Sequence, residues 1–331
     1  MRTRFAILGF GHHAILRLIS AFHESADCEL VGLWRRDPQK ASANAREFGI
    51  SNTFASAEEL CASPAVDAVF ITSPDALHKE HTLLALRHGK AVLCEKPLAL
   101  NAQQAQDMED VAQARGILFG VAQNLRYNRS VQTICQWIAE GKVGQPLLAN
   151  SQFTHLAAKS PRTWIYDPSL ATGGPIADIG VHCIDALRFV LQAEVESVTT
   201  QAHGDAGSGQ VESVASLNLA WTNGAVANVT VSTRAPYRTL LEVVGTEGTV
   251  RAENGLAVDR PVTVELWCDG ACLQQETMSN ADGYSRMLDD FSRSMRGETK
   301  YLAPGSDGVI NQRILDAAYR SARTGQREQI R

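Results

Sequence analysis

The segment Phe5-Ala6-Ile7-Leu8-Gly9-Phe10-Gly11-His12-His13-Ala14 is the strongest indication of the fold of this 331-residue chain. Four apolar residues predict a short buried strand, and the glycines predict a tight turn into a helix that begins near Ala14. In such a unit the first glycine permits the turn, and the second lets the backbone approach a pyrophosphate. The stretch therefore predicts a dinucleotide site at Gly9, Phe10, Gly11, His12 and His13. A purely structural turn is the alternative, with both histidines in solvent.

The first part of the chain alternates short apolar runs with amphipathic stretches. The predicted strands are 5–8, 30–34, 68–71, 91–94 and 118–121. Helical spacing lies between them, at 14–22, 38–48, 77–88 and 102–115. This alternation predicts an α/β fold, a doubly wound parallel sheet of Rossmann type, over residues 1–124.

Beyond residue 125 the pattern changes. A helix at 131–140 precedes β-rich segments at 195–203, 211–221, 225–233 and 240–244, and hairpin signals such as Thr222-Asn223-Gly224 separate them. Two helices, at 284–295 and 307–323, close the chain. Residues 125–331 are therefore predicted to form an α+β domain with a large, mostly antiparallel open sheet. Its C-terminal helix is a candidate to pack back on the first domain.

Composition narrows the class of partner. The chain has a net charge of −5 and 44% hydrophobic residues, and no face is obviously basic, so neither nucleic acid nor a membrane is expected as a partner. The start of the chain lacks the features of a signal peptide. Seven scattered cysteines, an odd number, indicate reduced thiols in a cytoplasm, and Cys268 and Cys272 are too isolated to suggest a metal site.

The second predicted strand ends in Trp34-Arg35-Arg36-Asp37, where a dinucleotide site needs a residue that contacts the adenine ribose. An acid at this place commonly accepts a hydrogen bond from the 2′-hydroxyl of NAD. Two guanidiniums instead suit a 2′-phosphate, since arginine binds phosphate bidentately. We therefore expect Arg35 and Arg36 to favour NADP(H), with NAD(H) as the alternative.

The run Ala91-Val92-Leu93-Cys94 predicts another buried parallel strand, and Glu95-Lys96-Pro97 follows it. Open α/β sheets bind ligands outside the carboxyl ends of their strands, so the ammonium of Lys96 is placed for chemistry. The alternative is an ordinary exposed lysine.

A second polar cluster follows Gly173-Gly174-Pro175, where the spacing from Asp178 to Leu191 is helical. Asp178, His182 and Asp185 stand at i, i+4 and i+7, which predicts one shared face. A carboxylate there can orient an imidazole that moves a proton. Metal binding is the competing interpretation, although no further histidine or cysteine stands at ligand spacing.

The chain resembles the glucose-fructose oxidoreductase/inositol dehydrogenase family, often called Gfo/Idh/MocA, over nearly its whole length. The resemblance rests on the dinucleotide loop and on three further motifs, which are Thr72-Ser73-Pro74-Asp75-Ala76-Leu77-His78, Glu95-Lys96-Pro97 and Asp178-Ile179-Gly180-Val181-His182. The motifs occur in the family's order. Together they are far more specific than any one of them.

The resemblance implies a role for each matching residue. Lys96 would polarise or protonate the reacting carbonyl, His182 would act as acid and base, and Asp178 would bind and orient substrate. The residues implied along the cofactor are Thr72, Ser73, Pro74, His78, Glu95, Lys96 and Arg126. Asp185, three residues past His182, would lie behind it and would not touch the substrate. Similar proteins often have a cis peptide before the proline at position 97.

The implied reaction is a hydride transfer between NADP(H) and a hydroxyl or carbonyl carbon of a sugar, cyclitol or related small polyol. His155, Trp164 and Tyr166 are candidate substrate residues beside Lys96, Asp178 and His182. Two departures from the family pattern, Pro175 for a glycine and Ile165 for an arginine, leave the substrate open.

Two other functions stay open on the resemblance. One is a glycoside hydrolase that retains its nicotinamide cofactor, and the other is a non-enzymatic regulator of the same fold. Relatives commonly associate through the open sheet, which implies a homodimer or homotetramer.

Overall fold

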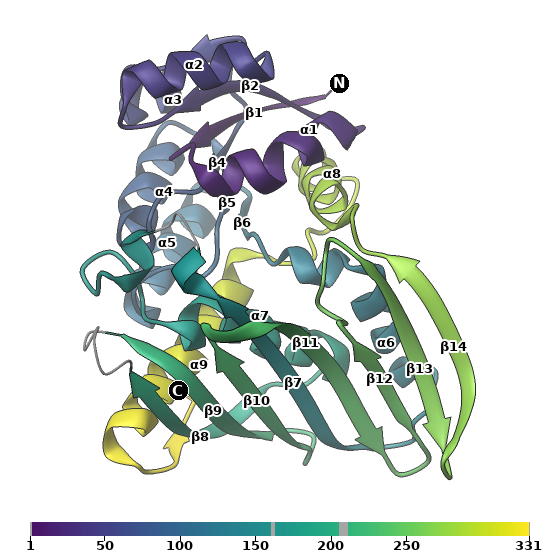
Figure 1. Cartoon of the computed structure of the whole chain (residues 1–331). Coiled ribbons are helices and arrows are strands. Elements are labelled where there is room, and N and C mark those ends of the chain that lie inside the picture. Colours follow the sequence, from purple (N-terminus) through teal and green to yellow (C-terminus); the bar gives the residue numbers. More distant parts are fainter. Residues whose placement is uncertain (1, 160–162, 205–210, 331) are drawn as a thin grey trace. The chain divides into compact units, whose positions relative to one another are not determined.

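The structure, a computed structural model, describes residues 2–159, 163–204 and 211–330, with the side chains of 159 and 166 excepted (Figure 1). It comprises two compact units. The first contains Met1–Gln123, Ser169–Thr172 and Tyr284–Gln312. The second contains Asn124–Pro168, Gly173–Gly283 and Arg313–Arg331. The units are thus not two continuous stretches of chain, and a domain boundary at 124/125 stays a prediction. No helix in the described ranges is long and apolar enough to cross a membrane.

The first unit is built on a six-stranded parallel sheet with the order β3-β2-β1-β4-β5-β6. Its strands are β1 (Thr3–Leu8), β2 (Cys28–Trp34), β3 (Asn52–Thr53), β4 (Ala68–Ile71), β5 (Ala91–Cys94) and β6 (Phe119–Val121). β4 and β5 are buried along their whole length, as continuous apolar strands of a parallel sheet must be. The predicted Rossmann fold is confirmed, and the short edge strand β3 was not predicted.

Helices cover both sides of this sheet (Figure 1). They are η1 (Ala14–Leu18), α1 (Ile19–Glu24), α2 (Pro38–Phe48), α3 (Ala57–Ala62), η2 (Asp75–Leu77), α4 (His78–Arg87), α5 (Ala102–Arg115) and α8 (Gly283–Met295). Asp37 caps α2 by accepting hydrogen bonds from the amides of Gln39 and Lys40. The segment η1 is a π-helix, so the helix predicted at 14–22 begins with a wider turn than an α-helix.

A late segment of the chain completes the first unit. The ring of Phe5 on β1 lies 5.5 Å from that of Phe22 and 5.7 Å from that of Phe291 on α8. The amide of Val121 on β6 donates to the carbonyl of Ala303 at 3.0 Å. The core of the parallel sheet therefore includes residues almost 300 positions downstream of its first strand.

The second unit contains a nine-stranded sheet with the order β14-β13-β12-β11-β7-β10-β9-β8-β15. The strands are β7 (Pro146–Leu156), β8 (Val195–Gly204), β9 (Glu212–Trp221), β10 (Val226–Ser232), β11 (Arg234–Gly245), β12 (Thr249–Glu253), β13 (Pro261–Cys268), β14 (Ala271–Ser279) and β15 (Glu328–Gln329). All neighbours are antiparallel except β7 and β10, which are parallel. The predicted, mostly antiparallel sheet is confirmed, while β7 and β12–β15 were not predicted.

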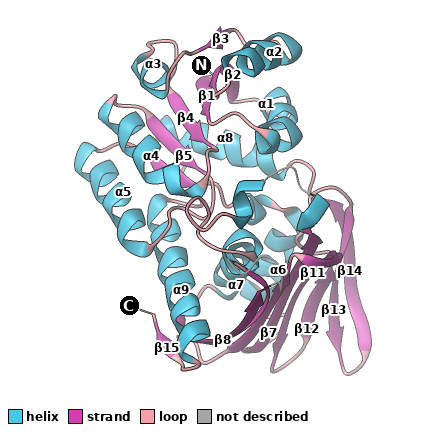
Figure 2. Ribbon diagram, turned by 60° about the vertical axis from the view of Figure 1, so that its left-hand side comes forward, coloured by secondary structure: helices cyan, strands magenta, loops and turns pink. Residues whose placement is uncertain are grey.

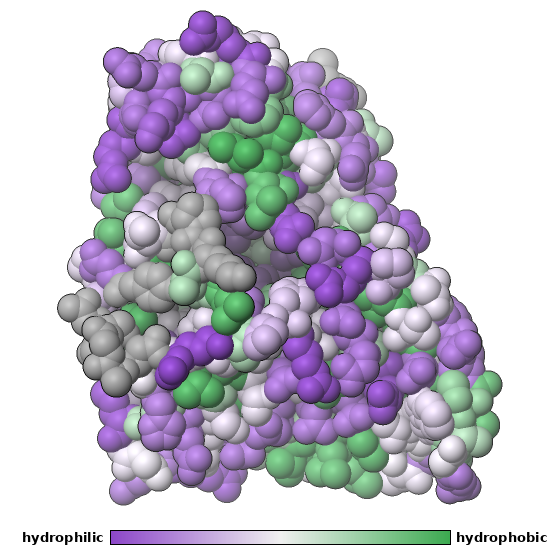
Figure 3. All heavy atoms as spheres, in the orientation of Figure 1, coloured by the Kyte–Doolittle hydropathy of each residue, from purple (hydrophilic) through white to green (hydrophobic). Residues whose placement is uncertain are grey.

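One face of this sheet is covered by helices (Figure 2), chiefly α6 (Arg129–Ala139) and α7 (Val181–Leu191). The remaining helical segments are η3 (Asn124–Tyr127), η4 (Ala157–Lys159), η5 (Thr163–Tyr166), η6 (Ile176–Gly180) and α9 (Gly305–Thr324), whose first turns belong to the first unit. The other face is largely hydrophilic at its centre (Figure 3), where Asn150, Gln152 and Asn228 line a shallow hollow. Leu148 and Val226, paired across β7 and β10, are each about half exposed there.

Candidate functional site

The loop after β1 is shaped by close backbone approach. Gly9 has a φ of +95°, and a Cβ at this position would lie 2.6 Å from the amide nitrogen of Ser73. The hydroxyl of Thr72 donates to the carbonyl of Gly9 at 3.1 Å. A side chain at position 9 would thus clash with the loop after β4, and the bare backbone is what a pyrophosphate site requires. These residues fit a dinucleotide.

The side chains beside that loop differ in what they contact. Phe10 is buried against Phe48, with ring centroids 6.2 Å apart, so only its backbone can face a cofactor. His12 is exposed. His13 Nε2 lies 3.0 Å from Glu95 Oε1, and its ring meets the edge of Tyr284. His13 and Glu95, both predicted at the cofactor, therefore join the loops after β1 and β5.

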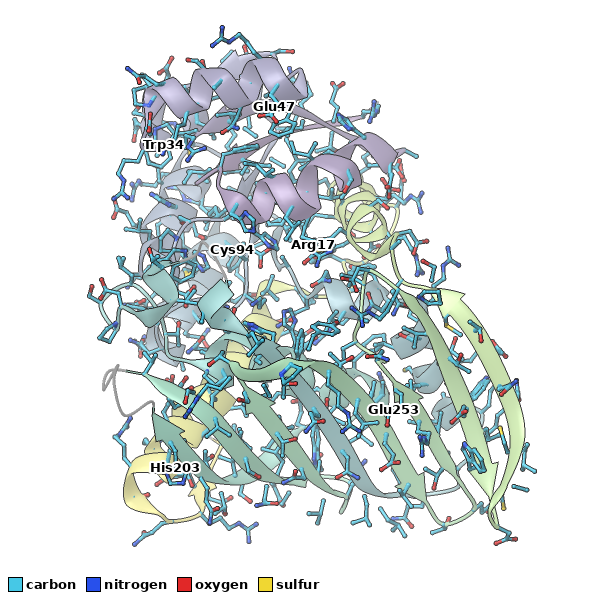
Figure 4. All side chains as sticks on the ribbon, viewed as in Figure 1. Arg17, Trp34, Glu47, Cys94, His203 and Glu253 are labelled. Carbon is cyan, nitrogen blue, oxygen red and sulfur yellow. The ribbon has the colours of Figure 1, made fainter. Side chains whose placement is uncertain are left out.

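The arginines predicted to bind the 2′-phosphate follow Trp34, the last residue of β2, which is labelled in Figure 4. Arg35 is partly buried and its Nη1 donates to Asn44 Oδ1 at 2.6 Å, which holds the guanidinium against α2. Arg36 is exposed. Two cations thus stand directly after β2, and α2 orients one of them.

Two histidines of α4 form hydrogen bonds with Ser73. His78 Nε2 lies 2.9 Å from the carbonyl of Ser73, and its Nδ1 lies 3.0 Å from the carbonyl of Pro97. His81 Nδ1 lies 2.9 Å from the hydroxyl of the same serine. His78 and the Ser73 side chain are both buried, so His78 orders the two loops and does not present its ring to a ligand. The position along the cofactor that the resemblance implied for His78 stays a prediction.

The geometry of His78 determines its charge. Both ring nitrogens face carbonyl oxygens, which only accept hydrogen bonds, and a neutral imidazole has a single N–H. Burial alone lowers the pKa of His78, but Cys94, Asp75 and the Ser73 carbonyl outweigh it and raise the pKa to about 10. Burial, with His78 beside it, lowers the pKa of His81 to about 4. The pair therefore consists of one imidazolium and one neutral ring.

Lys96 stands at the carboxyl end of β5, two residues after Cys94, which Figure 4 labels. The Lys96–Pro97 peptide bond is cis, as the resemblance implied. The amide of Lys96 donates to Glu95 Oε2 at 3.2 Å, and the lysine side chain is half-buried. Lys96, Glu95 and the Gly9 loop therefore occupy one edge of the parallel sheet.

In the second unit, Asp178 lies in the π-helical segment η6 and His182 lies in the first turn of α7. Asp178 Oδ2 is 3.5 Å from His155 Nε2. The His182 ring stacks on Phe153 of β7, with centroids 6.2 Å apart and an interplanar angle of 28°. The structure thus brings three predicted residues together, since His155 and His182 both lie beside the Phe153 ring and Asp178 contacts His155. An aspartate, two imidazoles and a ring face suit a hydroxylated molecule.

Asp185 has different partners. Arg126 donates to both its carboxylate oxygens, from Nε at 2.9 Å and from Nη2 at 2.7 Å, and the pair is almost completely buried. Asp185 is thus held in a buried ion pair on α7, and the predicted face that it shares with Asp178 and His182 stays a prediction. The cofactor contact implied for Arg126 stays a prediction.

The other predicted substrate residues contribute less. Trp164 on η5 is half-buried, and the side chain of Tyr166 lies outside what the structure describes. Ile165, one of the departures from the family pattern, is buried. No group of three or more metal-ligating side chains occurs within residues 2–159, 163–204 and 211–330.

Several residues at these places were not predicted. Phe153 and Tyr237 lie 5.8 Å apart beside the histidines of the second unit. Glu212 contacts the loop that precedes Asp178. The spacing of His78 and His81 along one helix could have predicted their common partner, whereas the other contacts join strands whose register the sequence does not reveal.

Comparisons with known proteins agree with this organisation. Residues 3–123 match the oxidoreductase family with an NAD-binding Rossmann fold. Residues 131–251 match the GFO/IDH/MocA C-terminal domain. A 1,5-anhydro-D-fructose reductase of Ensifer adhaerens is 32% identical over 305 residues, which cover 91% of each chain.

Two further likenesses extend over almost the whole chain. A D-xylose 1-dehydrogenase (NADP(+)) of Haloferax volcanii is 30% identical and covers 97% of this chain, as 98% of its own length. Among solved structures, an aldose-aldose oxidoreductase of Caulobacter crescentus has a TM-score of 0.91 at 23% identity, with 99% and 100% of the two chains covered. The latter is evidence for the fold alone.

Proposed function

The chain belongs to the GFO/IDH/MocA family of oxidoreductases with an NAD-binding Rossmann domain, and from this we propose that it transfers a hydride between NADP(H) and a hydroxyl or carbonyl carbon of a sugar, cyclitol or related small polyol. The observation that carries the proposal is the edge of the parallel sheet where the Gly9 loop, Glu95 and Lys96 lie together. A dinucleotide loop and an amine at one sheet edge are what such a reaction requires.

In the proposed cofactor site, the backbone of Gly9, Phe10 and Gly11 binds the pyrophosphate. The residues proposed to surround the pyrophosphate and the nicotinamide ribose are His12, His13, Thr72, Pro74 and Glu95. Ser73 contacts the cofactor through its backbone. His78 acts indirectly, because it joins the loops that contain Ser73 and Pro97. When bound, the nicotinamide supplies or accepts the hydride.

The chain's own residues handle charge and protons. Negative charge develops on oxygen as a carbonyl is reduced, and the Lys96 ammonium stabilises it electrostatically. His182 moves the proton, because an imidazole titrates in the useful range. Asp178 binds and orients the substrate, and the contact with His155 holds its carboxylate in place. Trp164 and Tyr166 are proposed as further substrate contacts.

The preference for NADP(H) over NAD(H) rests on Arg35 and Arg36. Two arginines in place of an acid favour a 2′-phosphate, and Asn44 already orients one of them. Relatives from Haloferax volcanii and Haloarcula marismortui are named as NADP(+)-dependent D-xylose dehydrogenases, which supports this choice.

The substrate class rests on the relatives and on the polar cluster of the second unit. Relatives are named for 1,5-anhydro-D-fructose, D-xylose and inositol, all of them small polyhydroxylated molecules. His155, Asp178 and His182 offer donors and acceptors to hydroxyl groups, and Phe153 offers an apolar surface to a ring. We also propose a homodimer or homotetramer through the sheet of the second unit, and a cytoplasmic location stays a prediction.

The deciding experiment is a screen of sugars and cyclitols with NADP+ and NADPH that follows the absorbance of the reduced nicotinamide. Net change in absorbance with a polyol supports the proposal. Product release without net change would indicate a hydrolase that retains its cofactor, and cofactor binding without any reaction would indicate a regulator.

The lysine variant tests the proposed chemistry. Lys96→Ala is expected to lower kcat by about 10²–10³-fold, the usual cost of removing one group that stabilises developing charge, while NADPH binding stays near that of the wild type. Lys40→Ala, at an exposed position on α2, is the matched control. Wild-type turnover in Lys96→Ala would remove Lys96 from the mechanism.

A further inference from the structure

We propose that Glu212 is a positioning residue for Asp178 and His182, because it holds the start of the helix that carries them. Glu212 is the first residue of β9, and nothing in the sequence motifs pointed to it. Its carboxylate accepts hydrogen bonds from the amide of Gly174 at 3.0 Å and from the amide of Ile176 at 3.0 Å. The inference rests on the proposed function, since it assigns Glu212 to the same chemistry.

The two amides need a partner that the helix itself does not supply. The first amides of a helix have no acceptor within the helix and are normally bound by the side chain of a local capping residue. Here the residue at the cap is Pro175, which makes no side-chain cap hydrogen bond. Glu212 supplies the missing acceptor from a neighbouring strand, and its negative charge suits the positive end of the helix.

The path from Glu212 to the candidate catalytic residues is short. The carbonyl of Gly174, whose amide is bound to Glu212, accepts from the amide of Asp178 at 2.9 Å. A single residue, Gly174, therefore connects the carboxylate to the backbone of Asp178. His182 follows four residues later on the same continuous helix.

A second residue fixes the carboxylate. The hydroxyl of Tyr319 on α9 donates to Glu212 Oε1 at 2.8 Å. A Cβ at position 173 would lie 1.9 Å from that hydroxyl, and a Cβ at position 174 would lie 2.0 Å from the carbonyl oxygen of Glu212. The two glycines are therefore needed for the approach of Glu212 and Tyr319.

Pro175 takes on a definite place in this arrangement. It stands between the two amides that Glu212 binds, and it has no amide of its own to leave unsatisfied. A proline at this position fixes φ without removing either contact. The departure from the family pattern is thus compatible with an anchored loop.

The test compares Glu212→Ala, Glu212→Gln and Tyr319→Phe with the control Glu196→Gln, an exposed carboxylate on the neighbouring strand β8. Glu212→Ala is expected to lower kcat by about 10²-fold, the effect of displacing a reacting group by about 1 Å. NADPH affinity is expected to stay close to the wild type, and Tm is expected to fall only by the cost of the lost hydrogen bonds. Glu212→Gln keeps one acceptor, so its kcat is expected to lie between those of the wild type and Glu212→Ala. Tyr319→Phe keeps both backbone contacts, and its kcat should fall by less than about 10-fold.

Amide hydrogen exchange provides a readout that does not depend on turnover. In Glu212→Ala, exchange should accelerate at the amides of both Gly174 and Ile176. In Glu212→Gln it should accelerate at only one of these two amides, and in the control at neither. Wild-type kcat in both Glu212 variants, or wild-type exchange at both amides, overturns the inference. A loss of kcat that is matched by lost NADPH binding and a lowered Tm also overturns it, since that is general destabilisation.

The two proposals fail differently. If the wild-type protein reduces or oxidises no polyol, the proposed function fails. Exchange in the Glu212 variants then still decides whether this carboxylate anchors the helix.

Discussion

At the scale of the residue, His78 shows how a buried group can hold a charge. A carbonyl oxygen faces each of its two ring nitrogens, and a nitrogen without a proton would set one acceptor against another. The ring therefore needs a proton on both nitrogens. In ¹⁵N-labelled protein at neutral pH, we expect both ring nitrogens of His78 to be protonated. A neutral tautomer in that spectrum would contradict the assignment.

The same histidine gives stability a pH dependence of known sign. A group whose pKa is raised on folding, here from 6.5 to about 10, stabilises the folded state fully below the lower value and loses this contribution as pH rises through the upper one. Urea unfolding of the wild type and His78→Gln should therefore differ most at acidic to neutral pH. The difference should shrink as pH approaches 10, and a constant difference would contradict the charged state.

Cofactor choice is also decided by single residues. The double variant Arg35→Ala/Arg36→Ala should lose about 10–100-fold in kcat/KM with NADPH and change little with NADH, because only NADPH carries the 2′-phosphate. Arg46→Ala, at an exposed position near the end of α2, is the control. A clear preference of the wild type for NADH would refute the argument from these arginines.

At the scale of the element, a buried ion pair joins η3 to α7. Asp185 binds Arg126 through two short contacts and lies 3.8 Å from Arg188. Asp185→Asn leaves buried guanidinium charge without its partner and should lower the free energy of unfolding by about 3–5 kcal/mol.

The matched control is the ion pair between Arg188 on α7 and Glu194, which follows the helix. Glu194 binds Arg188 at 2.7 Å but is about half exposed, so Glu194→Gln should cost about 0–1 kcal/mol. Denaturant unfolding measures both variants. Equal losses would show that burial does not set the strength of these contacts.

The sequence predicted elements well wherever an apolar run had an unambiguous period. β4, β5 and α5 have the bounds expected from the sequence, because the strands are buried on both faces and Gly116 ends the helix. β7 was missed because its buried residues Ala149 and Ser151 are small or polar while Leu148 is exposed, which obscures the alternation. The motifs predicted His155 and Asp178, but not the aromatic residues or Glu212, whose positions depend on strand pairing.

At the scale of the whole molecule, the proposed self-association can be tested on the uncovered face of the nine-stranded sheet. Leu148 and Val226 are register partners and are each about half exposed. Exposed apolar pairs of this kind favour contact with another surface. Val226→Glu should shift sedimentation towards the monomer, while Val226→Thr keeps the shape and should not. A mass in solution that neither variant changes would place the contact elsewhere.

Part of the core of the first unit comes from a segment that is synthesised long after the first strands of its sheet. Phe291 packs on Phe5, and Ala303 pairs with Val121, so residues 284–312 complete a sheet whose first strand begins at Thr3. A nascent chain that has emerged only as far as β6 lacks both contacts. The parallel sheet can therefore reach its final packing only after residues 284–312 have been translated, and a fragment that stops at residue 124 exposes the apolar surface that α8 normally covers.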